Sequence, residues 1–404
     1  MNKSLTAAYV FAQSPTGSHE LAGTLSQSRT AGTFVYSDQW LEHSWAYALD
    51  PVNLKLQTGA FTTTNTNKVF PVFSDAGPDD WGTKVLLAGH TRLPANEIER
   101  LLATSGHGVG CLRFSLSRSR PKEPAPAPSI NLLHELEDAS LKIANNQTVD
   151  PALLALLIPA TSMGGARPKI TLREGNKDYI AKFSKPGDLI NVPRVEYATM
   201  LLAQQCGINI PEIRLQNLSG RDAFIIQRFD RHQIQQLHYI SAHSLFNRDR
   251  VRLFDDAFAD PCSYIALAGI LRAHARDWHK NVTELFRRIV LNVYIGNLDD
   301  HGRNHGFLYD PANPGWQLSA AFDIVPTISQ GREHALGIGR YGRQRSMNNV
   351  LTAAEGFGLS DEEARRIIDE VVGVAAGWQV FFTNVGVTEQ DVAVLEKVIG
   401  CLGS

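Results

Sequence analysis

The segment from Gly296 to Gly306, GNLDDHGRNHG, carries the strongest chemical signal in the sequence. Asp299 is followed five residues later by Asn304, and Asp323 follows nineteen residues after that, in the stretch AAFDIVP. Phosphoryl transfer needs such a set, because one carboxylate orients a hydroxyl and accepts its proton while an amide and a second carboxylate hold Mg²⁺. Taken alone, the segment is also consistent with a polar loop that caps a helix.

A second group of residues points to the same chemistry. Lys182 lies inside the apolar stretch YIAKF, Glu196 follows fourteen residues later, and IIQRFD (225–230) ends an apolar run. In kinases, a lysine on a strand pairs with a helix glutamate to position ATP phosphates. Lys182 alone could instead be an edge-strand lysine that extends to water. The order of lysine, glutamate, hinge strand, catalytic loop and metal carboxylate favours a kinase.

Secondary structure patterns explain how these residues are positioned. KITLREGNKDYIAKF (169–183) predicts two strands around a hairpin turn at 174–177, and RDAFIIQRFDR (221–231) predicts a strand. VEYATMLLAQQCG (195–207) predicts a helix that stops at its glycine. FRRIVLNVYIG (286–296) has apolar residues at helical spacing, so we expect a buried helix that delivers the catalytic loop. AAFDIVP (321–327) resembles a strand in its apolar content.

The proline-rich stretch RSRPKEPAPAPSI (118–130) predicts an exposed linker whose two sides still pack together. Before it we expect strands at 32–37 and 70–73, a helix at 78–89 and a glycine turn into a strand at 106–116. After it we expect helices at 132–146 and 151–160, the second one short and buried. Near the C-terminus, the stretches 359–378 and 388–402 predict further helices.

Composition narrows the classes of protein. The 404 residues include 39 Lys and Arg against 41 Asp and Glu, which gives a net charge of −2. This charge argues against a protein that binds nucleic acid mainly through its own electrostatic attraction. The four cysteines are far apart, which excludes a disulfide scaffold or a cysteine zinc site. No apolar run approaches the roughly 20 residues that span a bilayer. We therefore expect a cytoplasmic globular protein.

Three weaker patterns receive structural interpretations. GIGRYG (337–342) spells a nucleotide-loop motif but follows every other kinase element, so we interpret it as a strand and turn. RDRVR (248–252) is interpreted as solvated surface rather than a DNA contact. His301 and His305 could suggest a zinc pair, but the oxygen ligands of Asn304 and Asp323 favour a hard cation.

The chain resembles the HipA toxin kinases of bacterial type II toxin–antitoxin modules across nearly its whole length. The segments that carry the resemblance are ELAGTL, GTFVYSDQWL, PDDWGTKVLLAG, SMGGARPKI, YIAKF, VEYATMLLAQQCGINIP, QRFDR, GNLDDHGRNHGF and AAFDIVP. The resemblance implies an α+β, bilobed protein-kinase-like fold. Its expected parts are a small N-terminal α/β subdomain (1–128), a kinase N-lobe (129–235) and a mainly helical C-lobe (236–404).

The resemblance also implies roles for individual residues. Asp299 matches the catalytic base, and Asn304 and Asp323 match the Mg²⁺ ligands. The neighbouring Asp300 leaves the choice of base to experiment, and we favour Asp299 for its spacing to Asn304. Ser162 matches a serine that is autophosphorylated, which inactivates the kinase. The residues implied in ATP binding are Lys182, Glu196, Gln227, Phe229, Gly164, Gly165, Ala166, Arg167 and His301.

The family implies ATP and Mg²⁺ as cofactors and an aminoacyl-tRNA synthetase or another translation protein as substrate. It also implies a HipB-like helix-turn-helix antitoxin as partner, with DNA bound only through that partner. LHYISAHSLFN (237–247) departs from the acidic segment of the best-known members, which leaves the substrate open. Two alternatives remain: a small-molecule kinase of the aminoglycoside or choline type, and a co-repressor subunit without catalysis.

Overall fold

The computed structural model describes residues 4–89, 94–103, 106–158, 165, 167–232, 235–246, 260–329 and 331–401. The chain divides into two units. Unit 1 contains residues 1–186, 225–245 and 308–315, and unit 2 contains residues 187–224, 246–307 and 316–404. Strands β9 (Arg221–Gln227) and β13 (Gly306–Tyr309) each begin in unit 2 and end in unit 1. Among the described residues, no helix is long and apolar enough to cross a membrane.

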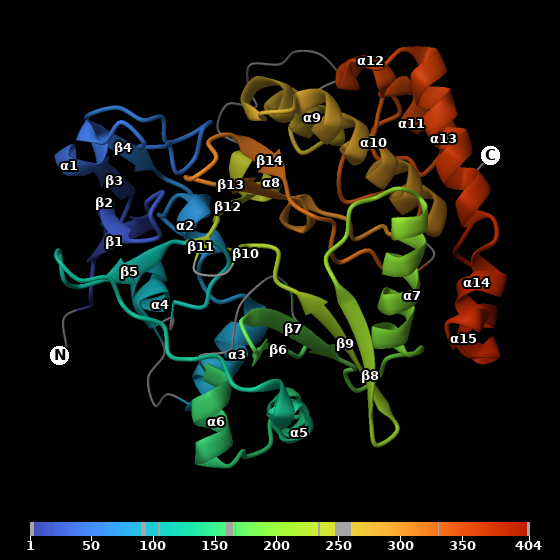
Figure 1. Ribbon diagram of the computed structural model, residues 1–404, viewed down its shortest axis with the longest axis horizontal. Helices are drawn as coiled ribbons and strands as arrows, with labels where there is room; N and C mark the ends of the chain where they lie inside the picture. Colours follow the sequence, from blue (N-terminus) through green and yellow to red (C-terminus); the bar gives the residue numbers. More distant parts are fainter. Residues whose placement is uncertain are drawn as a thin grey trace. The chain divides into compact units, whose positions relative to one another are not determined.

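The N-terminal part of unit 1 is built on a five-stranded antiparallel sheet in the order β4-β3-β2-β1-β5 (Figure 1). The expected strand at 32–37 is confirmed as β3, whose alternate residues Phe34 and Tyr36 are buried. Phe34 packs at 4.9 Å between ring centroids against Phe73, so aromatic residues fill this core. The strands are β1 (Ala7–Gln13), β2 (His19–Gln27), β3 (Gly32–Tyr36), β4 (Ala60–Thr63) and β5 (Arg113–Ser115).

The strand expected at 70–73 is wrong, because this stretch begins the short helix α2 (Pro71–Asp75). Pro71 occupies the first helical position, where a missing N–H costs nothing and the fixed φ angle favours the helix. Val72 and Phe73 are buried, so the apolar content reflects burial and not strand structure. The other helices of this part are α1 (Asp38–Glu42), α3 (Asp80–Gly89) and α4 (Glu97–Ala103), and α3 confirms the helix expected at 78–89.

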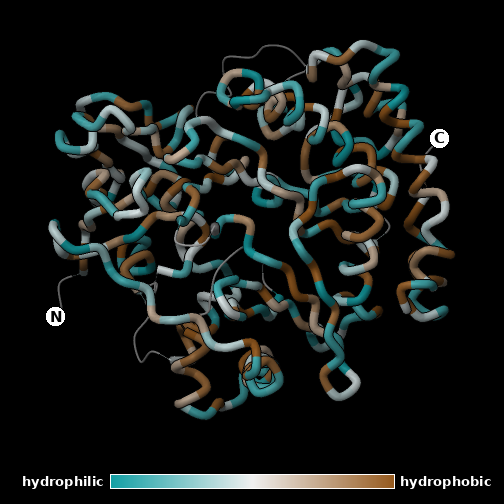
Figure 2. Tube along the Cα trace, viewed as in Figure 1, coloured by the Kyte–Doolittle hydropathy of each residue, from teal (hydrophilic) through white to brown (hydrophobic). Residues whose placement is uncertain are grey.

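The linker prediction is confirmed, since residues 118–128 form neither helix nor strand and are mostly exposed. After a short 3₁₀ turn (Ile130–Leu132) come α5 (Leu133–Ala144) and α6 (Pro151–Leu157). Figure 2 shows α6 as mostly apolar, yet Leu157 is its one fully buried described residue, so the expected burial is only partial. Lys84 of α3 donates to the Ala144 carbonyl at 2.9 Å, which joins the two sides of the linker.

The expected hairpin of unit 1 is confirmed as β6 (Lys169–Glu174) and β7 (Lys177–Phe183). Its antiparallel register runs from Lys169 opposite Lys182 to Glu174 opposite Lys177. Gly175 has a φ of +58° in the turn, a conformation that glycine adopts without strain. Unit 1 also holds β10 (Arg231–His232), β11 (Gln235–Gln236), β12 (His238–Ser241) and α8 (Ala242–Leu245).

Unit 2 is mainly helical, and its longest helix is α10 (Trp278–Ile295). The expected apolar face is buried at Phe286, Ile289, Val290 and Val293, and the helix ends at Gly296 with a φ of +72°. The expected helix ending near Gly207 is confirmed as α7 (Val192–Gln205). Unit 2 also contains α9 (Tyr264–His274), β8 (Ile213–Leu218), β14 (Trp316–Leu318), α11 (Met347–Thr352) and α12 (Ala354–Phe357).

The C-terminal helices differ in how well they match expectation. Helix α13 (Asp361–Ala375) begins with a capping box at Ser360 and Glu363, and its hydropathy alternates along the trace (Figure 2). The single helix expected at 388–402 is shorter, α15 (Glu389–Leu395), and it is preceded by α14 (Trp378–Asn384). The strand expected at 321–327 is wrong, because this stretch has no regular structure.

Candidate active site

The loop after α10 starts from a fixed point. Arg345 is buried, and its guanidinium donates to the carbonyls of Val293, Tyr294 and Val398 at 2.8, 2.9 and 2.8 Å. These bonds satisfy carbonyls at the helix end that have no partner within the helix. A Cβ atom at Gly296 would lie 2.7 Å from Val398 and 2.8 Å from the Arg345 guanidinium, so only glycine fits this exit. The segment 297–305 therefore leaves the helix in one direction.

The two adjacent aspartates of this loop have opposite environments. Asp300 is 2% exposed, and its Oδ2 accepts hydrogen bonds from Asn292 Nδ2 at 2.8 Å, from His305 Nε2 at 2.9 Å and from the Tyr264 hydroxyl. Burial alone would raise the pKa of Asp300, but His305 and the Tyr264 hydroxyl outweigh burial and hold it below its ordinary value. Asp300 is thus an ionised carboxylate with a structural role, and its Oδ2 atom already accepts three hydrogen bonds from neighbouring side chains.

Asp299, by contrast, is exposed, and its backbone rather than its side chain holds it in place. The N–H groups of Leu298 and Asp299 donate to Thr327 Oγ1 at 3.0 and 3.3 Å, and the Asp299 carbonyl accepts from Asn304 Nδ2 at 3.4 Å. An exposed carboxylate on a fixed backbone can receive a substrate hydroxyl. This division favours Asp299 over Asp300 as the base.

The amide side chain of Asn304 faces the same loop. Asn304 ends a 3₁₀ turn (Gly302–Asn304) and is 7% exposed, and its Nδ2 is used by the Asp299 carbonyl. His301 precedes this turn, and its Nδ1 is buried without a hydrogen-bond partner among the described residues. A buried ring nitrogen without a partner is costly, so this atom is a candidate contact for a bound ligand.

A zinc pair at His301 and His305 has no support. His305 Nε2 is bonded to Asp300 at 2.9 Å within the buried cluster, so this ring nitrogen is already used. The loop and the segment tied to it through Thr327 instead carry the amide oxygen of Asn304 and the carboxylate of Asp323. Such hard donors suit Mg²⁺, so the residues present fit the cation that a kinase uses.

Asp323 has an unusual backbone. Its φ of +60° is in the left-handed region, which costs a residue with a Cβ roughly 1–2 kcal/mol. Four residues later, Thr327 donates its N–H to the Gly296 carbonyl at 2.9 Å, and its hydroxyl holds the amides of Leu298 and Asp299. The segment that carries Asp323 is thus tied to the loop that carries Asp299. Strained backbone at a chemically competent residue is typical of functional sites.

In unit 1, the candidate phosphate lysine lies opposite a second lysine. Lys182 on β7 pairs in register with Lys169 on β6, so both side chains leave the same face of the hairpin. Lys169 is buried and forms an ion pair with Asp79 at 2.9 Å, and it also donates to the Gly165 carbonyl at 3.1 Å. Asp79 therefore offsets the charge of Lys169 but lies ninety residues away from it, and sequence reasoning missed this pair.

Other expected site residues are placed only in part. Gly165 is exposed with a φ of +108° and Arg167 is half-buried, whereas Ser162, Gly164 and Ala166 lie outside the described residues. Gln227 ends β9, and Phe229 packs against the cluster of Val109, Leu237, Tyr239 and Leu308. Glu196 is buried on α7 in unit 2 while Lys182 belongs to unit 1, so the expected pair of these two residues stays a prediction.

Comparisons with known proteins find matches over most of the chain. A family model described as HipA-like C-terminal domain matches residues 161–378, and one described as HipA N-terminal domain matches residues 17–115. A putative kinase of Haemophilus influenzae is 30% identical over 182 residues, covering 41% of this chain and about half (52%) of that protein. The serine/threonine-protein kinase toxin HipA of Shewanella oneidensis is 22% identical over 339 residues, covering 76% of this chain and 72% of that one.

A solved structure establishes the fold. In the complex of Shewanella oneidensis HipA with HipB and operator DNA, a chain that is 17% identical superposes with a TM-score of 0.69, covering 97% of this chain and 94% of that chain. The expected α+β fold of the HipA type is therefore confirmed.

Proposed function

The chain belongs to the HipA family, and from that premise we propose that it is an ATP- and Mg²⁺-dependent protein serine/threonine kinase acting as the toxin of a type II toxin–antitoxin module. The observation that carries the proposal is the contrast between exposed Asp299 and buried Asp300 on one fixed loop. The exposure of Asp299 supports its proposed role as the residue that meets the substrate. The expected cytoplasmic location stays a prediction.

In the proposed reaction, a serine or threonine hydroxyl of the substrate attacks the γ-phosphorus of ATP. The new O–P bond forms as the bond between the γ-phosphorus and the bridging oxygen breaks, and ADP leaves. Asp299 accepts the hydroxyl proton. Asn304 and Asp323 would hold Mg²⁺, which supplies positive charge against the phosphate oxygens.

The remaining residues would bind the nucleotide. Lys182 would contact the phosphates, supported by its position on a strand opposite the neutralised Lys169. Gln227 and Phe229 would contact adenine, and the buried Nδ1 atom of His301 supports a ligand contact at the loop that carries Asp299. The loop residues Gly164, Gly165, Ala166 and Arg167 would cover the phosphates, and Glu196 would orient Lys182.

We further propose that the substrate is an aminoacyl-tRNA synthetase or another translation protein and that Ser162 is autophosphorylated. A phosphate on Ser162 would add about −1.5 to −2 charges beside a site for ATP phosphates. The added charge would repel ATP and switch the kinase off. Synthetase modification would stop tRNA charging and arrest growth.

A helix-turn-helix antitoxin is the proposed partner, and DNA would be bound only through it. The related Shewanella HipA is found in a complex with HipB and operator DNA, and this chain's net charge of −2 gives it little attraction for DNA of its own. Tight operator binding by the isolated chain in a gel-shift assay would contradict this proposal.

The central experiment incubates the purified chain with ATP, Mg²⁺ and a bacterial lysate, and maps new phosphosites by mass spectrometry. Wild type should phosphorylate protein hydroxyls, and Asp299→Asn should lose this activity. Asp369→Asn, an exposed carboxylate of α13, serves as the matched control and should remain active. Full activity of Asp299→Asn would sink the assignment.

The acceptor of the phosphate distinguishes a protein kinase from the alternative, a small-molecule kinase. Phosphate on Ser162 or on lysate proteins supports a protein kinase. Phosphorylation of an aminoglycoside or choline, with no protein phosphosite under active conditions, would support the alternative instead.

A further inference from the structure

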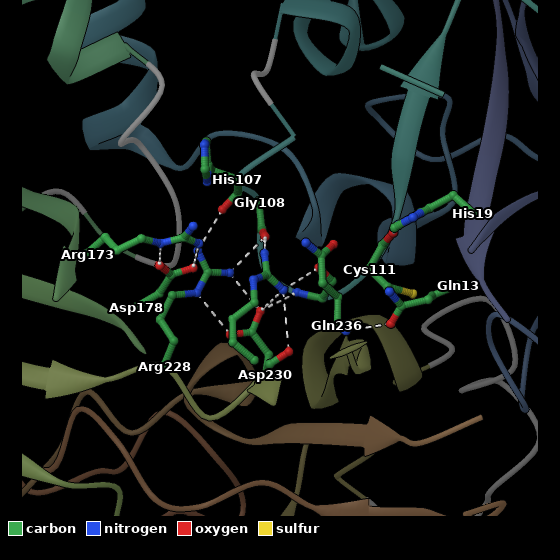
Figure 3. Close-up of polar contacts among 12 residues, drawn as sticks. Gln13, His19, His107, Gly108, Cys111, Arg173, Asp178, Arg228, Asp230 and Gln236 are labelled. Carbon is green, nitrogen blue, oxygen red and sulfur yellow. Dashed lines mark hydrogen bonds and ion pairs between the residues drawn. The ribbon is translucent and has the colours of Figure 1, made fainter. Parts of the chain in front are cut away.

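A buried group of charges joins the candidate hinge to the glycine-rich turn of the N-terminal part, within unit 1 (Figure 3). It consists of Arg228, Asp230 and Arg231 together with the backbone of residues 107–110, and we call it the hinge clasp. Both side chains of the Arg228–Asp230 ion pair are fully buried. None of the residues given a chemical role above belongs to the clasp.

Asp230 is the centre of the hinge clasp. Its carboxylate accepts from Arg228 Nε at 3.0 Å, from a terminal nitrogen of Arg228 at 2.7 Å and from Arg231 at 2.8 Å. It also accepts the Gly110 N–H at 2.7 Å, a contact that spans 120 residues of sequence. Burial alone would raise its pKa, but the two guanidinium groups outweigh burial and lower the pKa of Asp230 to about 2.

The two arginines also hydrogen-bond to the backbone carbonyl oxygens of the turn. Arg228 donates to the carbonyls of His107 and Gly108, both at 2.9 Å. Arg231 donates to the carbonyls of Gly108 and Gly110 at 3.0 and 2.8 Å. A planar guanidinium with fixed donors defines the position of what it binds more closely than a lysine would.

The glycines at 108 and 110 allow the turn to pack closely against its neighbours. A Cβ atom at Gly108 would lie 2.0 Å from the Ala76 carbonyl oxygen, and one at Gly110 would lie 2.9 Å from Tyr239. Gly110 also has a φ of +79°. The sequence interpretation of this motif as a structural turn is therefore correct, and the structure adds what the turn is bound to.

The clasp residues alternate with the candidate adenine contacts along the chain. Gln227 and Phe229 are half-buried, whereas Arg228 and Asp230 are fully buried, as expected for extended backbone whose side chains point to opposite sides. The Arg228 N–H also donates to the Asp178 carbonyl of β7 at 2.9 Å. The clasp thus fixes the backbone on which the candidate hinge contacts are mounted.

We propose that Arg228, Asp230 and Arg231 are positioning residues for adenine binding, and that the N-terminal part of the chain is thereby an integral component of the nucleotide site. Replacing a buried ionic cluster by apolar residues is often neutral for stability, so its use here is to define one geometry of the hinge. This inference rests on the proposed function, since it assumes that residues 227–229 contact ATP.

The test measures the affinity of the full chain for Mg²⁺ and ADP by calorimetry, together with its urea denaturation curve. Asp230→Asn should raise the Kd for ADP roughly tenfold, which corresponds to about 1.4 kcal/mol of binding free energy lost when the hinge backbone shifts. In kinase assays the KM for ATP should rise more than kcat falls.

Asp50→Asn is the matched control. Asp50 is equally buried in unit 1 and accepts from the Val52 and Asn53 amides at 2.9 and 2.8 Å, away from the clasp. Burial raises the pKa of the Asp50 carboxyl to about 6, so its charge does not stabilise the fold. Asp50→Asn should leave the Kd for ADP within about twofold of wild type, which separates positioning by Asp230 from the loss of a buried carboxylate as such.

Each outcome decides one statement. If wild type does not bind ADP, the proposed function fails. If folded Asp230→Asn binds ADP like wild type, the clasp inference is overturned. If Asp230→Asn does not fold, the Kd for ADP is measured on Arg231→Lys instead. This variant keeps the positive charge but loses the paired hydrogen bonds to the Gly108 and Gly110 carbonyls. A several-fold weaker ADP affinity in that variant supports the inference, and an unchanged affinity overturns it.

Discussion

Asp300→Asn tests whether one of the two aspartates in the candidate catalytic loop has a structural role. An asparagine can place its oxygen where Oδ2 of Asp300 now accepts hydrogen bonds from Tyr264, Asn292 and His305. The contacts survive but lose the carboxylate charge. Since hydrogen bonds to charged groups contribute about 1.5–3 kcal/mol and neutral ones about 1, the three together lose about 3 kcal/mol.

Relief of the desolvation cost of a buried charge offsets part of that loss, which leaves about 2 kcal/mol. For a unit of 150–250 residues, each kcal/mol shifts Tm by roughly 2–4 °C, so we expect Tm to fall by about 4–8 °C. Asp299→Asn should leave Tm within about 1–2 °C, because exposed substitutions stay within roughly 0.5 kcal/mol. Its kcat should fall by about 10²–10⁴, the usual contribution of a general base.

The assay is differential scanning fluorimetry beside a radiolabelled phosphate-transfer assay, run well below the lower Tm. Asp300→Asn should retain measurable transfer. The opposite pattern, an unstable but active Asp299→Asn and a stable but inactive Asp300→Asn, would refute the assignment.

The dependence of stability on pH in the acid range gives a second test of the role of Asp300. Because the pKa of Asp300 is lowered in the folded state, its stabilisation is present above the ordinary carboxyl pKa and is lost as pH falls below it, and this loss should be absent from the variant.

Three further predictions concern the elements around the site. Asp79→Asn leaves buried Lys169 without its counter-charge, so it should cost about 3–5 kcal/mol in urea unfolding and raise the KM for ATP; an unchanged KM would contradict a link between this pair and Lys182. Gly296→Ala should cost more than the roughly 1 kcal/mol of left-handed strain, because its Cβ meets Val398 and Arg345, and a wild-type Tm would refute the fixed exit from α10. Asp230 should stabilise the fold above its unfolded pKa of about 3.9 and lose that effect as pH falls toward 2, so acid unfolding of Asp230→Asn should show a flatter pH dependence there.

Local patterns in the sequence were sufficient for the elements that carry the site. The hairpin of β6 and β7 is marked by alternation around Gly175, and α10 by apolar spacing that ends at Gly296. Both signals lie within a few residues of the structure they produce. The strand predicted at 70–73 was wrong because this local signal is too short: a four-residue apolar run does not distinguish a strand from the first turn of a buried helix.

What the sequence could not show are pairings between distant residues. Lys169 and Asp79 are ninety residues apart, and the partners of Asp230 are separated from it by up to 120 residues. Charged residues are ordinarily exposed, so a buried pair has no local signature. The spacing to Asn304 favoured Asp299 over Asp300, but the difference in burial between these two neighbours became visible only in the fold.

The hinge clasp has a consequence for how the chain folds during synthesis. The carbonyls of residues 107 and 108 accept hydrogen bonds from arginines that are translated 120 to 123 residues later. At 5–20 residues per second, the ribosome needs roughly ten seconds to make that stretch. Until then the turn keeps polar groups that only water can satisfy, and its burial must wait. We therefore expect a nascent chain cut before residue 228 to leave this turn open to protease, and the proposed nucleotide site to form late in translation.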